Sequence, residues 1–206
     1  MAYLDGDALS DRVEVIPNQG FTQLVVSYGD QRSSVIPIGS GDSIALLKLS
    51  SGDFTGGGES DLIALTSDPV SGTYSITIIS SPAGEYTVYT MPDAATDAHY
   101  RFQAEFTRGY VLELSSQAYD FVLSVQIGAD ETRAVYKDDG TVPATLRASV
   151  SGFNDYTLTM YNDRLAMDLW QTVSSTAQEQ PLGFIVSTMV WQDGAPRLTA
   201  QRYVAN

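Results

Sequence analysis

Strict alternation of apolar and polar side chains recurs along this chain and constrains its fold more than any other sequence feature. In the segment 100–106, the aromatic residues and Ala104 fall on one face of an extended chain, and Arg101, Gln103 and Glu105 fall on the other. The same alternation occurs in the segments 73–78, 86–90 and 120–127. A repeat of two residues is typical of a strand that has one buried face and one solvated face, as in antiparallel sheets.

Turn sequences separate these segments and point to a protein built from many short strands. Residues of the turn-forming type occur at Asn18–Gly20, Tyr28–Asp30, Asp138–Gly140 and Gln192–Gly194. Further runs rich in β-forming residues lie between the turns, at 12–16, 21–28, 33–38, 43–49, 61–66, 132–137, 144–150, 156–161, 183–191 and 198–204. Short strands at this spacing predict an all-β protein, with antiparallel sheets arranged as a sandwich or a barrel.

One segment departs from the alternation and predicts a short helix near 163–177. Asn162 or Asp163 can cap its start, and Pro181 lies just beyond its end. Its apolar residues recur at helical spacing, at Ala166, Leu169, Trp170, Val173 and Ala177. A strand that alternates through Leu165, Met167 and Leu169 competes for the same residues, and the helix is the favoured interpretation.

A small, polar and aperiodic stretch at 92–98 is typical of a linker. It divides the chain into an N-terminal domain at 1–91 and a C-terminal domain at 99–206, which contains the expected helix. Each part is long enough for one β-sandwich. The alternative is a single larger sandwich in which 92–98 is one long connection.

The charge of the chain excludes several classes of partner. The 206 residues carry 25 acidic and 11 basic side chains, for a formal charge of −14. Such a surface repels nucleic-acid phosphates and anionic membranes, so we expect neither as a partner. No apolar run is long enough to span a bilayer, and the residues from Met1 to Ser10 show no secretory signal.

Residues suited to catalysis are few, and their arrangement favours a protein that is not an enzyme. His99 is the single histidine, no Gly-x-Ser-x-Gly motif accompanies it, and an ordinary surface role is the favoured interpretation. Glu105 and Glu113 lie on neighbouring predicted strands and are the one candidate pair for glycoside hydrolysis. Both occupy polar positions of alternating patterns, so a solvated strand face is favoured.

The sequence also predicts no metal site and no cofactor. There is no cysteine, and a zinc site with one histidine would be unusually rich in carboxylates. Asp5, Asp7 and Asp11 can chelate Ca²⁺ in principle, but they lack the spacing of an EF-hand, and a polar N-terminal arm is favoured. Gly39 and Gly41 lack the third glycine and the lysine of phosphate-binding loops.

Aromatic residues are the remaining candidates for function. The chain contains 12 Tyr and 2 Trp. Aromatic side chains on strands usually pack against cross-strand neighbours, which is the favoured interpretation, whereas an exposed row can hold sugar rings or a protein partner. If a partner is held in this way, the candidate contact residues are Trp170 and Trp191.

The order of elements in the C-terminal part resembles a known family. Residues 119–125 form an alternating strand, and an Asp-Gly hairpin follows at 134–140. Then come the strands at 144–150 and 156–160, a short helical piece and a Pro-x-Gly entry at Pro181. This order is similar to the immunoglobulin-like β-sandwich modules of tailed-phage tail, baseplate and fibre proteins, best over 119–204. The N-terminal part resembles the same theme loosely, with Tyr86 in the place of a tyrosine corner.

The resemblance implies a non-enzymatic structural protein of the virion of a tailed phage or virus. Its expected place is the tail, the baseplate, a fibre attachment or the capsid decoration, after synthesis in the host cytoplasm. Its expected partners are other virion proteins and copies of itself, with a host-surface glycan as a further candidate. The alternative is a carbohydrate-binding β-sandwich module, and a hydrolase built on Glu105 and Glu113 is the third hypothesis.

Overall fold

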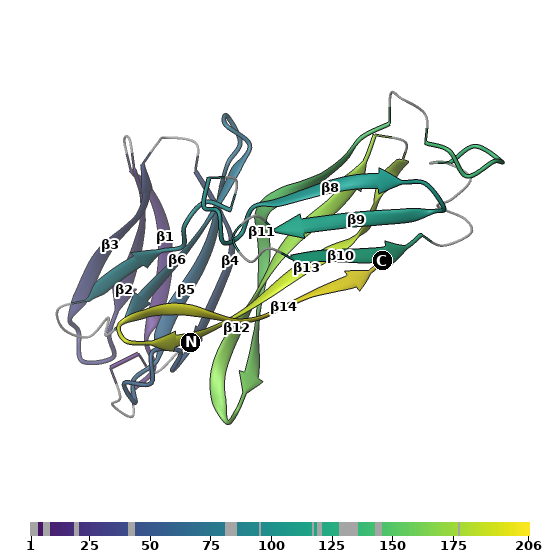
Figure 1. The fold of residues 1–206 in the computed structure, drawn as a ribbon. Coiled ribbons are helices and arrows are strands. Elements are labelled where there is room, and N and C mark those ends of the chain that lie inside the picture. Colours follow the sequence, from purple (N-terminus) through teal and green to yellow (C-terminus); the bar gives the residue numbers. More distant parts are fainter. Residues whose placement is uncertain are drawn as a thin grey trace. The chain divides into compact units, whose positions relative to one another are not determined.

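A computed structural model contains fourteen strands in four antiparallel sheets and no helix among the described residues (Figure 1). The all-β fold class predicted from the alternation is thereby confirmed. The described residues are 4–5, 9–18, 21–40, 44–80, 86–94, 96–116, 118, 121–127, 136–142, 146–176 and 178–206. The strands are β1 (Arg12–Asn18), β2 (Phe21–Ser27), β3 (Ser33–Ser40), β4 (Ala45–Gly52), β5 (Asp61–Asp68), β6 (Thr73–Ser80), β7 (Thr87–Thr90), β8 (Phe102–Thr107), β9 (Val111–Ser116), β10 (Phe121–Gln126), β11 (Ala148–Tyr161), β12 (Arg164–Ser175), β13 (Gln178–Gln192) and β14 (Ala195–Ala205).

The chain packs into two units. Unit 1 consists of Met1–Met91, Asp155–Asp168 and Thr188–Thr199, and unit 2 consists of Pro92–Asn154, Leu169–Ser187 and Ala200–Asn206. Each of the strands β11 to β14 therefore supplies residues to both units. The division into separate domains at 1–91 and 99–206 stays a prediction.

Two sheets of unit 1 share one apolar core. The first has the strand order β1-β2-β3 and the second the order β4-β5-β6-β7. Leu24, Val26 and Ile36 from the first sheet are fully buried together with Leu62 and Ile79 from the second. Leu62 and Ile79 are directly paired across β5 and β6, so this row of side chains faces the first sheet.

The opposite face of the β4–β7 sheet is also buried. Ile63 and Ile78 are paired across β5 and β6, and both have exposures near zero. The Tyr156 hydroxyl, on β11, donates a hydrogen bond of 2.7 Å to the Ile63 carbonyl. The Lys48 ammonium, on β4, bonds the Asp155 carboxylate at 2.9 Å. Residues of β11 thus cover the face of the sheet that β1–β3 leaves open.

Unit 2 has its own core, to which β8, β9 and β10 contribute one wall. In the register of this sheet, Leu123 pairs with Leu114, and Leu114 pairs with Ala104. This row alternates with the solvated positions, as the sequence predicts for these strands. Leu114 packs in one cluster with Val173 from β12 and Ile185 from β13.

The prediction of a helix near 163–177 is wrong, because Arg164–Ser175 forms strand β12. Asn162 and Asp163 have φ angles of 49° and 61°, which are the left-handed values of a two-residue hairpin turn between β11 and β12. Ala166, Met167 and Leu169 all have zero exposure, so β12 is buried on both faces in this stretch. A strand buried on both faces loses its alternation, and its apolar residues then imitate helical spacing.

Several sequence expectations fall partly or wholly outside the described residues. Among them are the strands expected at 132–137 and 144–150, the turn at Asn18–Gly20, and Asp7. Tyr86 is described, and its hydroxyl donates to the Val35 carbonyl at a sequence separation of 51. A tyrosine corner bonds a carbonyl only a few residues upstream, so Tyr86 does not form one. In the described part of the chain, no helix has the length and apolar character needed to cross a membrane.

The buried hydroxyl of Tyr156 provides a test of how β11 is attached in unit 1. Burial raises the pKa of this side chain, which therefore stays protonated as a donor. We expect Tyr156→Phe to lower the free energy of unfolding by about 1 kcal/mol, because the hydrogen bond to Ile63 is lost inside the core. Urea unfolding of the full chain measures this change. The control is Tyr161→Phe on the same strand, where the side chain is exposed and we expect no loss; an equal loss in both variants contradicts the assignment.

Candidate functional site

Trp191 lies in strand β13 within unit 1 and is half-buried. Its indole ring meets the ring of Phe54 edge-on, with the centroids 6.1 Å apart and the planes at 70°. It meets the ring of Tyr89, on β7, in the same manner, at 5.9 Å and 82°. Edge-to-face contacts of this kind are favourable and fix the orientation of the indole.

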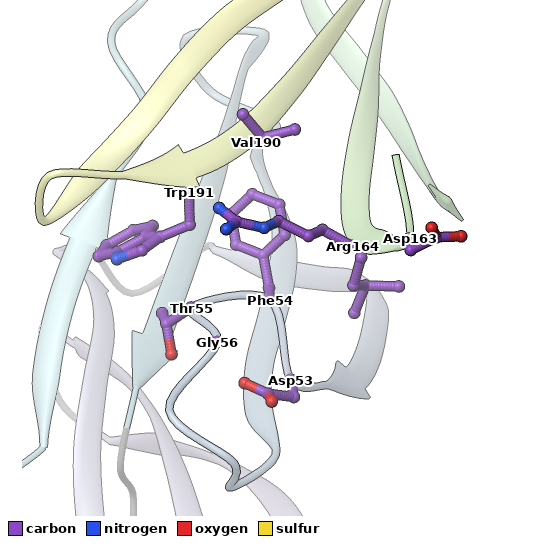
Figure 2. Close-up of a pocket in the computed structure, with 9 residues that line it drawn as sticks. Asp53, Phe54, Thr55, Gly56, Asp163, Arg164, Val190 and Trp191 are labelled. Atoms are coloured by element: carbon purple, nitrogen blue, oxygen red, sulfur yellow. The ribbon is translucent and has the colours of Figure 1, made fainter. Parts of the chain in front are cut away.

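Trp191 forms one side of a cavity of about 350 Å³, which we call the Trp191 pocket (Figure 2). Three segments of unit 1 contribute to it: the loop that follows β4, the turn between β11 and β12, and the end of β13. Figure 2 shows the Arg164 side chain reaching from the turn toward the side where Phe54 and Trp191 lie. The lining residues are Asp53, Phe54, Thr55, Gly56, Asp163, Arg164, Leu165, Val190 and Trp191.

A buried carboxylate holds the loop that lines this pocket. Asp61, at the start of β5, is 1% exposed and accepts hydrogen bonds from the Thr55 amide at 2.7 Å and the Thr55 hydroxyl at 3.1 Å. Burial raises the pKa of Asp61 above its usual value, although these hydrogen bonds oppose the shift. Gly56 has a φ of 76°, a left-handed value that glycine adopts without strain. Asp61 therefore anchors the loop at Thr55, and residues 53–56 of the loop line the pocket.

The polar groups of the pocket include both hydrogen-bond donors and acceptors. The guanidinium of Arg164 is exposed and has no ion pair or hydrogen bond with any described residue. Asp53 and Asp163 supply carboxylate oxygens, and Asp53 also accepts the Gly58 amide at 3.1 Å. With one Arg and two Asp, the pocket has a formal charge of −1. It can donate and accept hydrogen bonds beside an aromatic ring.

Trp170 is the other aromatic residue singled out from the sequence, and it lies in a part of β12 that belongs to unit 2. It is half-buried and meets Phe184 edge-on, with ring centroids 5.6 Å apart and planes at 75°. Trp170 and Trp191 thus belong to different units. A role in partner contact stays a prediction for both.

Unit 2 contains an apolar groove, which we call the β10–β14 groove, with a volume of about 550 Å³. Its polar lining residues are Ser124, Gln126, Gln201 and Arg202. Its floor consists of core residues and their half-buried neighbours: Phe102, Leu114, Leu123, Val125, Ile185 and Tyr203. The groove therefore has an apolar floor that is continuous with the core of unit 2.

The strands that border the groove are both at the edge of their sheets. β10 pairs only with β9, and β14 pairs only with β13, among the described residues (Figure 1). A strand at the end of a sheet is a place where a further strand can be added. Val122, on β10, adds an apolar side chain that is 59% exposed.

The remaining candidates for catalysis are the Glu105–Glu113 pair and His99. Glu105 and Glu113 are directly paired across β8 and β9, which brings the two carboxylates to one face of the sheet. Glu105 is exposed and Glu113 is half-buried. His99 is exposed, and its Nδ1 lies 2.9 Å from the Asp97 carboxylate. Neither His99 nor the Glu pair lines the Trp191 pocket.

The N-terminal aspartates have structural partners where they are described. Asp11 is 1% exposed and accepts hydrogen bonds from the Leu4 amide and the Gly29 amide. Asp5 forms an ion pair with Arg32 at 2.9 Å. Asp7 lies outside the described residues, and no group of three potential metal ligands occurs within them.

Sequence reasoning found Trp191 but missed the polar residues beside it. Asp53 and Arg164 are 111 positions apart, and neither belongs to a recognisable motif. The one available signal was the Asn162–Asp163 pair, which as a hairpin turn places Arg164 at the start of a strand.

No protein-family model, curated protein or solved structure matches this chain.

The raised pKa of Asp61 gives a pH-dependent prediction for the loop below the pocket. Because its folded-state pKa lies above the unfolded value, the carboxyl stabilises the fold below the unfolded pKa, and this contribution is lost as the pH rises through the folded pKa. Asparagine keeps an acceptor for the Thr55 amide and carries no charge. We therefore expect Asp61→Asn to be more favourable for stability, relative to the original chain, at pH 7 than at pH 3.5.

Urea unfolding of both chains at the two pH values measures this difference and cancels the titration of the other acidic residues. Asp68→Asn is the matched control, because hydrogen bonds from Ser71 and Val70 lower the pKa of that exposed carboxyl. Its effect on stability relative to the original chain should therefore change with pH in the opposite direction. An Asp61→Asn difference that is independent of pH contradicts the prediction.

Proposed function

We propose that this chain is a non-enzymatic structural protein of the virion of a tailed phage or virus. It assembles through protein–protein contacts in the tail, the baseplate, a fibre attachment or the capsid decoration. We further propose that its sheets are arranged as immunoglobulin-like β-sandwiches. The observation that carries the assembly proposal is the β10–β14 groove, an apolar groove bordered by two strands that stand at the ends of their sheets.

The groove favours an extended polypeptide as its occupant. The edges of β10 and β14 offer backbone groups that an added strand can bond, and the apolar floor offers space for its alternate side chains. Leu114 and Ile185 are almost fully buried at the bottom of the groove, so side chains of a partner would extend an existing core. The partner is a strand of another virion protein or of a second copy of this chain.

The charge of the chain is consistent with this role. A formal charge of −14 opposes non-specific association and leaves binding to specific contacts. Backbone pairing along a strand edge together with apolar side chains is such a contact, because it depends on register and on shape.

Proteomics of purified particles and mass photometry of the isolated protein test the proposal together. We expect the chain in virions, and we expect a complex with a virion protein or with itself. A strict monomer that is absent from virions and binds no virion protein contradicts it.

A single lysine on the edge of β10 tests the groove itself. Val122→Lys places a charge on the unpaired edge strand, where lysine opposes the addition of another strand. We expect the Kd of the complex, with the virion partner or with a second copy of the chain, to be at least about tenfold higher than for the original chain. This change corresponds to about 1.4 kcal/mol of binding free energy. Sedimentation velocity over a concentration series measures the change.

Val70→Lys is the matched control for this variant. Val70 is 83% exposed, lies between β5 and β6 of unit 1, and is not among the residues that line the groove. The same substitution there should leave the Kd unchanged. If both lysine variants weaken association equally, charge rather than the groove is responsible, and the assignment of the groove is wrong.

The alternative, a carbohydrate-binding module, has one observation in its favour. Trp191 presents a half-buried indole beside hydrogen-bonding side chains, which is a combination that suits sugars. The Trp191 pocket lies wholly within unit 1 and the β10–β14 groove wholly within unit 2, so one chain can carry both functions.

A further inference from the structure

We propose that the Trp191 pocket binds one neutral hexopyranose residue of a glycan. This binding function goes beyond assembly, because none of the residues of the pocket belongs to the β10–β14 groove. Three features of the pocket favour this ligand: the fixed indole ring, the mixture of polar groups, and the charge and size of the cavity.

The indole of Trp191 is suited to stack on a sugar ring. Phe54 and Tyr89 hold it edge-on, so little conformational entropy remains to be lost when a ligand packs against it. Trp191 is nevertheless only half-buried, and it lines the cavity. The C–H groups of a pyranose form a flat apolar face that an aromatic ring can cover.

The polar groups around the indole match the hydroxyls of a sugar. The guanidinium of Arg164 only donates hydrogen bonds, and the carboxylates of Asp53 and Asp163 only accept them. A sugar hydroxyl does both, so neighbouring hydroxyls can satisfy an arginine and an aspartate at once. Hydrogen bonds to charged groups are also stronger than those between neutral groups. The absence of a described partner for the Arg164 guanidinium leaves its donors available to a ligand.

The charge and the volume of the pocket further limit the class of ligand that it can bind. The pocket has a formal charge of −1 within a chain of −14, which disfavours phosphates, sulfates and acidic sugars. A cationic ligand would face the guanidinium of Arg164. The volume of about 350 Å³ is at the small end of the range for ligand pockets, which suits one sugar residue rather than a long oligosaccharide.

Tryptophan fluorescence provides a direct test in the full chain. Trp170→Phe leaves Trp191 as the single tryptophan, so that emission reports on the pocket. The probes are the methyl α- and β-pyranosides of D-glucose, D-galactose and D-mannose. We expect a saturable change in emission with at least one of them, with a Kd on the order of 1 mM, as is reasonable for a ligand of this size. Sodium D-glucuronate at matched ionic strength should bind several-fold more weakly.

Two arginine variants in the same background make the test specific. Arg164→Ala removes the guanidinium of the pocket, and we expect the Kd to rise at least about tenfold. Arg197→Ala removes an exposed arginine of unit 1 that does not line the pocket, and the Kd should not change. Both side chains are exposed, and equal urea midpoints confirm that both variants are folded.

Two results would overturn the proposal. The first is the absence of a saturable change with every glycoside up to about 50 mM, well above the expected Kd. The second is an equal weakening by Arg164→Ala and Arg197→Ala. Neither result bears on particle proteomics or on the Val122→Lys variant, so the glycan site and the assembly function can fail independently.

Discussion

Unit 1 depends on the burial of both faces of the β4–β7 sheet. Strand β5 contains an unbroken series of buried residues from Asp61 to Thr66, and an exposed sheet with such a strand would leave a large apolar surface in water. Strands β1–β3 cover one face through Leu62 and its neighbours. The other face needs residues 93 positions away, as the hydrogen bond from Tyr156 to Ile63 shows. Residues from Asp155 to Asp168 therefore belong to the same unit as this sheet.

The same constraint creates the Trp191 pocket. Covering the β4–β7 sheet brings the end of β13 to Phe54 and Tyr89, and it brings the β11–β12 turn to the loop after β4. Polar residues that lie at turns for local reasons, such as Asp163, become neighbours of a half-buried aromatic ring. In unit 2, by contrast, the terminal strands β10 and β14 of two sheets border the β10–β14 groove, which has an apolar floor. One unit thus presents a polar pocket and the other an apolar groove.

The strands predicted best from the sequence are those with one buried face and one solvated face. In β8, buried Phe102 and Phe106 alternate with less buried residues. The structure has β8 and β10 within two residues of the segments 100–106 and 120–127 where the alternation places them. The prediction failed at β12, where Ala166, Met167 and Leu169 are buried on two faces and the period of two disappears. Of the candidate site, Trp191 was found because large aromatic residues stand out in any sequence. Arg164 was not found, because the sequence around an exposed arginine does not show which residues surround it in the fold.

Local patterns by themselves determined that this chain is all-β, where many of its turns occur, and that its surface is acidic. These properties follow from period, turn chemistry and composition, which act over a few residues or over the whole chain regardless of fold. Tertiary structure alone decided which faces of β5 and β12 are covered, which strand edges stay open, and which polar residues surround Trp191. These are long-range outcomes, because side chains about 100 positions apart meet only when the complete set of sheets has buried its apolar faces.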